Sequence, residues 1–71
     1  MQHDPRFPLW ADAVRATYAA LGAQSRAAWR AAATAWDTLV SMHDPTENDR
    51  AIYHFMAVQS WMQAADWRMK P

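Results

Sequence analysis

Apolar residues recur along the chain at spacings of three and four residues, which predicts three helices and no strands. A first periodic segment follows two prolines and ends near Gly22, a second begins after Ser25, and a third follows Pro45. Proline suits the first helical turn, serine caps an N-terminus, and glycine suits the residue after the last turn. The predicted helices therefore cover about residues 8–21, 25–43 and 45–68, with Gly22 ending the first.

The first two predicted helices each carry one apolar stripe, which is typical of a helix with a single buried face. The stripe of the first helix consists of Trp10, Ala13, Val14, Thr17 and Leu21. The stripe of the second consists of Trp29, Ala32, Trp36, Leu39 and His43, widened by Ala33 and Val40. Short connections favour antiparallel neighbours, so we expect a single all-α domain over residues 1–71. Its architecture is predicted to be a small three-helix bundle, or a long helical hairpin with a shorter N-terminal helix packed across it.

The third predicted helix is apolar on two sides, so its pattern leaves a choice between two faces. One side carries Ala51, Phe55, Val58, Met62, Ala65 and Met69, with Trp61 beside it, and we expect this side to be the core. The opposite side carries Tyr53, Met56, Ala57, Ser60, Ala64 and Trp67. Either the first helix covers this second side or another protein does. The start of the helix is predicted from Asp44 as N-cap, Pro45 at the first helical position and Glu47 at the third.

The composition favours an ordered chain with an unusual core. Leucine, isoleucine and valine are few, whereas alanine is abundant and five tryptophans occur in only 71 residues. Low aliphatic content indicates disorder only when net charge is high, and here seven basic side chains balance seven acidic ones. Since each tryptophan can bury about 150–250 Å², we expect a core of a few large rings set among alanines.

Charge and targeting signals narrow the class of partner and the location. A formal net charge of zero argues against nucleic acid and anionic membranes, because both require a positive footprint. No apolar run approaches the roughly 18 residues of a membrane span, and the first residues lack the pattern of a signal peptide. The absence of cysteine is compatible with a cytoplasmic protein. Abundant alanine, and six arginines against one lysine, suggest a bacterial source.

The sequence offers little catalytic or metal-binding chemistry. It has no glycine-rich phosphate loop, no nucleophile elbow and no cysteine. The three histidines, His3, His43 and His54, do not have the spacing of a known metal site. We therefore predict a protein that is not an enzyme and that uses no metal, cofactor or small-molecule substrate.

The second apolar side of the third helix carries the functional prediction. We expect a small helical protein–protein interaction module, acting as a homodimer or as an adaptor or inhibitor that occupies a partner's surface. Phage- or plasmid-encoded accessory proteins are one group of this class. The predicted partner-binding residues are Tyr53, Met56, Ser60 and Trp67, because tyrosine, tryptophan and methionine favour binding surfaces. The alternative is a nucleic-acid-binding accessory or regulatory protein that uses Arg15, Arg26 and Arg30.

Overall fold

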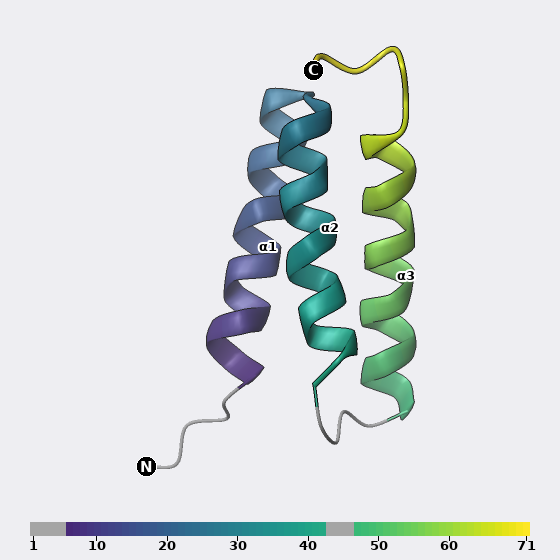
Figure 1. Cartoon of the computed structure of the whole chain (residues 1–71). Coiled ribbons are helices and arrows are strands. Elements are labelled where there is room, and N and C mark those ends of the chain that lie inside the picture. The colour runs from purple at the N-terminus through teal and green to yellow at the C-terminus, as the bar shows by residue number, and fades with distance from the viewer. Residues whose placement is uncertain (1–5, 43–46) are drawn as a thin grey trace.

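In the described part of the chain three helices lie side by side (Figure 1). The computed structural model describes residues 6–42 and 47–71, in which α1 spans Arg6–Ala23, α2 spans Arg26–Val40 and α3 spans Glu47–Ala64. The described residues contain no strand, which confirms the prediction of an all-α three-helix bundle. Helix α2 lies between α1 and α3 and packs against both, whereas α1 and α3 touch only slightly. The bundle is consequently an open layer, with Cα extents of 43 × 23 × 13 Å.

The junction between α1 and α2 differs from the prediction at one residue. Helix α1 continues through Gly22, and Gln24 takes the left-handed conformation with φ of 52°. The Gln24 backbone N–H donates to the carbonyl of Ala20 at 2.9 Å, and its side-chain amide donates to the carbonyl of Leu21 at 2.7 Å. These two bonds satisfy carbonyls at the helix end and offset the cost of a positive φ at a residue with a Cβ. The predicted stop at Gly22 is therefore wrong.

The start of α2 and the end of α3 are fixed by specific hydrogen bonds. The Ser25 hydroxyl accepts from the backbone N–H of Ala28 at 3.1 Å, which confirms the predicted N-cap. Helix α3 ends at Ala64, before its predicted end, and residues 65–71 turn back toward the α1–α2 junction (Figure 1). There the Lys70 backbone N–H donates to the carbonyl of Gln24 at 3.1 Å. The predicted start signal at Asp44 and Pro45 lies outside the described residues.

Two tryptophans of α2 organise the interior. Trp36 is buried in one cluster with Ala13, Leu39, Tyr53 and Ala57. Trp29 is buried in a second cluster, whose other buried members are Ala20, Ala32 and Ala64. The prediction of a few large rings set among alanines is confirmed. So is the predicted buried stripe of α2, except that Val40 is only half-buried and that His43 lies outside the described residues.

Helix α1 turns its small side chains, and not its large ones, toward α2. Ala13 and Ala20 are fully buried, whereas Trp10 and Leu21 are 44% and 51% exposed. The predicted core stripe of α1 is therefore correct at Ala13, correct in part at the half-buried Val14 and Thr17, and wrong at Trp10 and Leu21. Alanines without bulky side chains allow two helix axes to approach closely, so the large residues are left on the adjoining face.

Helix α3 shows the same arrangement, and the prediction of its faces is reversed. Its buried residues belong to the second side, for which the sequence leaves the first helix or another protein as the cover: Tyr53, Ala57, Ser60 and Ala64. Helix α2 packs on this side instead. The expected core residues Phe55 and Met62 are 60% and 61% exposed, and Ala51, Val58, Trp61 and Ala65 are exposed as well. Size is the physical reason, since two alanines and a serine let α3 lie close to α2. Met69 lies beyond α3 and is partly buried against the Trp29 cluster.

Candidate functional site: an apolar groove between the outer helices

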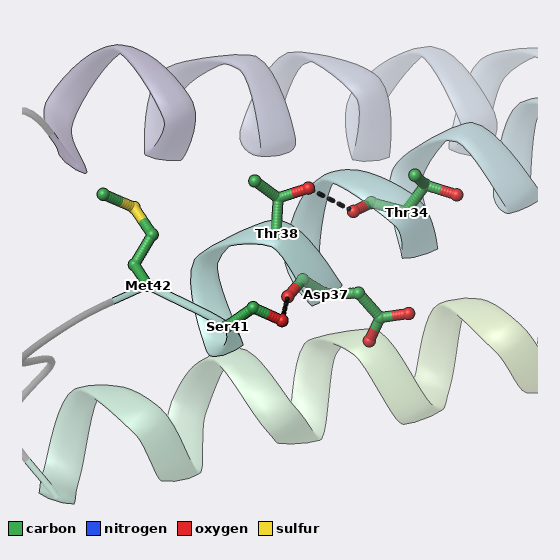
Figure 2. Close-up of a pocket in the computed structure, with 5 residues that line it drawn as sticks. All are labelled: Thr34, Asp37, Thr38, Ser41 and Met42. Carbon is green, nitrogen blue, oxygen red and sulfur yellow. Dashed lines mark hydrogen bonds between the residues drawn. The ribbon is translucent and has the colours of Figure 1, made fainter.

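The molecule has a polar hollow on α2 and an apolar groove between α1 and α3. Figure 2 shows the polar hollow, which has a volume of about 460 Å³ and is lined by Thr34, Asp37, Thr38, Ser41 and Met42. Three of these side chains bear hydroxyls and one bears a carboxylate. The hollow is therefore the more obvious place to look for chemistry.

The polar groups of this hollow are already engaged within the chain. The hydroxyls of Thr38 and Ser41 donate to the carbonyls of Thr34 and Asp37, each at 3.0 Å (Figure 2). The carboxylate of Asp37 accepts a hydrogen bond from Nε1 of Trp61 at 2.7 Å, which ties α2 to α3. Hydroxyls that donate to the carbonyl one turn back are common on exposed helices and have no catalytic implication.

The groove is lined by larger and more apolar side chains. It has a volume of about 470 Å³ and is lined by Trp10, Val14, Thr17, Tyr18 and Leu21 of α1, Trp36 of α2, and Ile52 and Met56 of α3. No charged residue from the described part of the chain is among them. Mostly apolar concave surfaces with a few polar groups are the usual binding sites of proteins.

The floor of the groove is a rigid junction of all three helices. Nε1 of Trp36 donates to the hydroxyl of Thr17 at 2.8 Å, and that hydroxyl donates in turn to the carbonyl of Ala13 at 2.8 Å. On the other side the Trp36 ring stacks on Tyr53, with ring centroids 6.1 Å apart. The Trp36 indole of α2 thereby contacts both α1 and α3 at the base of the groove.

The walls of the groove expose large side chains that a monomer leaves in water. Tyr18 is 71% exposed and Ile52 is 49% exposed, although both line the groove. Phe7 extends the same surface along α1, because its ring lies 6.3 Å from that of Trp10. We call this surface the groove face, and it consists of Phe7, Trp10, Val14, Tyr18, Leu21, Ile52 and Met56. An exposed apolar surface of this extent on a small protein indicates an interaction site.

The predicted partner-binding residues occupy three different environments. Tyr53 and Ser60 are 8% and 1% exposed and pack inside the chain, so their expected exposure is wrong. Met56 is half-buried and lines the groove. Trp67 is 82% exposed and lies beyond the end of α3, so α1 does not cover it. Met56 and Trp67 stay predictions for partner contact.

Sequence reasoning missed the main part of the groove face, which belongs to α1. The sequence pattern gives no role to Tyr18 or Ile52, and it predicts Trp10 and Leu21 in the core. The sequence signal that could have identified this face is a spacing of three and four residues along α1, at Phe7, Trp10, Val14, Thr17 and Leu21. The same spacing occurs where a helix packs on another helix.

The arginines of the nucleic-acid alternative lie on two helices. Arg15 is exposed on α1 and pairs with Asp12 at 2.7 Å, which neutralises part of its field. Arg26 and Arg30 lie one turn apart in the first half of α2, and Arg30 is exposed. Nucleic-acid binding through these residues stays a prediction.

One ion pair perturbs titration, and it lies outside the groove. The Arg68 side chain and backbone N–H both donate to the Asp66 carboxylate, and they hold the pKa of Asp66 below its usual range. The same side-chain hydrogen bond raises the pKa of Arg68.

Among the described residues there is no group of three His, Cys, Asp or Glu side chains placed to hold a metal ion. None of the helices in residues 6–42 and 47–71 has the length and apolar character required to cross a membrane.

The chain matches no known protein family, no curated protein and no solved structure. The groove face is therefore interpreted from its own residues.

Proposed function

We propose that the protein is a small non-enzymatic interaction module that binds a helical element of a protein in the groove between α1 and α3. The observation that carries the proposal is the groove itself, which is walled by exposed tryptophan, tyrosine, leucine and isoleucine side chains. In helix-in-groove recognition, a helix places apolar side chains spaced three and four residues apart into an apolar groove of its partner. The groove between α1 and α3 can accept such a helix.

The physical support is the contrast between the two sides of the layer. On the polar side, the hydroxyls and carboxylate around Asp37 are satisfied within the chain. On the groove face, side chains such as Tyr18 and Leu21 retain water-exposed apolar surface that a partner would bury. Tyrosine and tryptophan are enriched among residues that dominate binding energy, so Trp10 and Tyr18 are the proposed anchors.

Site-specific photo-cross-linking in the cells that express the chain tests this function. A benzophenone amino acid is placed at Tyr18 on the groove face, and at Thr38 on the polar side as the matched exposed control. We expect covalent protein adducts from position 18 and none from position 38. A second substitution, Ile52→Glu, should abolish the adducts because it places a charge in the groove wall.

Two results would refute the proposal. One is the absence of adducts from both positions. The other is an equal yield from positions 18 and 38, since Thr38 lies outside the groove.

A further inference from the structure

We infer that the groove face is covered by a second copy of this chain, in a two-fold dimer in which α1 of each copy lies in the groove of the other. The inference rests on the proposed function and specifies its partner. It is argued from the shape of the layer, the exposed area, and the pattern of α1.

A single layer of helices leaves its apolar face without cover. Stable domains bury each apolar face against another element and consist of at least two packed layers. Here α2 buries Trp29 and Trp36 against its neighbours, but α1 and α3 scarcely touch and leave the groove open above Trp36. A second copy supplies the missing layer without any additional kind of molecule.

The exposed area agrees with what a dimer needs. Five groove-face side chains retain between 44% and 71% of their surface, namely Phe7, Trp10, Tyr18, Leu21 and Ile52. At about 150–250 Å² for a large side chain, this leaves on the order of 100 Å² on each, or roughly 500 Å² together. A standard interface buries about 800 Å² on each partner, of which about 65% is apolar in homodimers. The groove face therefore provides the apolar part of one such interface.

Along the groove, α1 has the residue spacing of a helix that packs on other helices. Phe7, Trp10, Val14, Thr17 and Leu21 follow one another at spacings of three, four, three and four. In this seam Phe7, Trp10 and Leu21 are exposed, whereas Val14 and Thr17 are half-buried toward the groove floor. The seam contains no charged residue that would be buried without a partner. The helix that fits an uncharged apolar groove must itself present an uncharged apolar face, and α1 presents one. In a two-fold arrangement the same surface serves as ridge and groove, so the interface is self-complementary.

Single-cysteine variants test the second copy directly, because the chain contains no cysteine of its own. Tyr18→Cys and Leu21→Cys place a thiol on the groove face, and Thr38→Cys places one on the polar side as control. After mild oxidation of the purified protein, we expect a disulfide-linked species of twice 8.1 kDa from at least one groove variant and none from Thr38→Cys.

A charge substitution gives the quantitative arm. Tyr18→Glu should raise the dimer dissociation constant about 100-fold or more, because the substitution enters a two-fold interface twice. Size-exclusion chromatography with light scattering measures the shift, and circular dichroism checks that the variant stays helical. If Tyr18→Glu loses its helical signal, dilution of the unmodified chain decides, since a reversible dimer loses mass once it is diluted to its dissociation constant, whereas a monomer keeps a constant mass.

The outcomes separate this inference from the proposed function. A purified chain that stays at 8.1 kDa, or cross-links equally from Thr38→Cys, overturns the second copy. If position 18 still forms photo-adducts in cells, and these contain only a different protein, the interaction module stands and the dimer does not. Groove-specific cross-linking together with dissociation of Tyr18→Glu supports the dimer.

Discussion

Trp29 and Trp36 are both buried, but only one of them has a partner for its indole N–H. Nε1 of Trp36 donates to the hydroxyl of Thr17, whereas Nε1 of Trp29 has no hydrogen-bond partner in the described part of the chain. Phenylalanine removes the same atoms from either ring. Trp29→Phe and Trp36→Phe are therefore a matched pair that isolates the hydrogen bond from the packing.

The expected free energies of unfolding differ between the two variants by a measurable amount. Loss of the larger ring costs about 1–2 kcal/mol at each site, between an Ile→Val change and a full truncation. At Trp36 the lost hydrogen bond adds about 1 kcal/mol. At Trp29 the removal of an unpaired buried N–H returns about 1–3 kcal/mol, which offsets the packing loss. Trp36→Phe should thus be less stable than Trp29→Phe by about 2–4 kcal/mol, a large part of the roughly 4–11 kcal/mol expected for a chain of this size.

Urea unfolding followed by far-ultraviolet circular dichroism measures this difference, because tryptophan fluorescence changes with the substitutions themselves. All variants are compared at one protein concentration, since dimerisation would couple stability to concentration. Trp67→Phe is the control, and it should change stability by less than about 0.5 kcal/mol because its side chain is 82% exposed. Equal losses at Trp29 and Trp36, or a larger loss at Trp29, would refute the reasoning.

Two further predictions concern α3 and the C-terminal segment. Ala57→Leu should destabilise the fold by about 1–3 kcal/mol, because Ala57 is 2% exposed against α2, whereas Ala51→Leu on the outer side should stay within about 0.5 kcal/mol. Urea midpoints of the two variants test the orientation of α3, and the opposite ranking would show that the helix is rotated. The pKa of Asp66 lies below its ordinary value of 3.8, so its pairing with Arg68 stabilises the folded state above that pH and stops doing so as pH falls through the lowered pKa. The melting-temperature advantage over Asp66→Asn should therefore shrink between about pH 6 and about pH 2, and a constant difference would contradict it.

Local signals predicted the helices, their approximate bounds and the interior of α2. The stripe containing Trp29, Trp36 and Leu39 was correctly predicted because α2 has a neighbour on each side and buries its large residues between them. The helix stop at Gly22 failed for a local reason. Gly22 stays in the helix, and the positive φ occurs two residues later at Gln24, whose side-chain amide donates to the carbonyl of Leu21.

The faces of the outer helices could not be predicted from periodicity, for a reason that bears on function. A three-and-four spacing identifies a face that will be covered, but it does not say whether the same chain or another molecule covers it. In α1 and α3 the large residues, such as Leu21 and Phe55, were assigned to the core, whereas alanines such as Ala20 and Ala57 occupy it. For Leu21 on the groove face this arrangement is expected when the outer surface is itself an interface, whereas Phe55 lies outside the groove face.

Sedimentation equilibrium of the unmodified chain over a dilution series tests the covered groove most directly. A two-fold dimer predicts a mass that approaches twice 8.1 kDa at high concentration and falls toward 8.1 kDa on dilution, with the transition moved to higher concentration in Tyr18→Glu. A mass of 8.1 kDa at every concentration would contradict the second copy, and so would a dimer that Tyr18→Glu leaves unchanged.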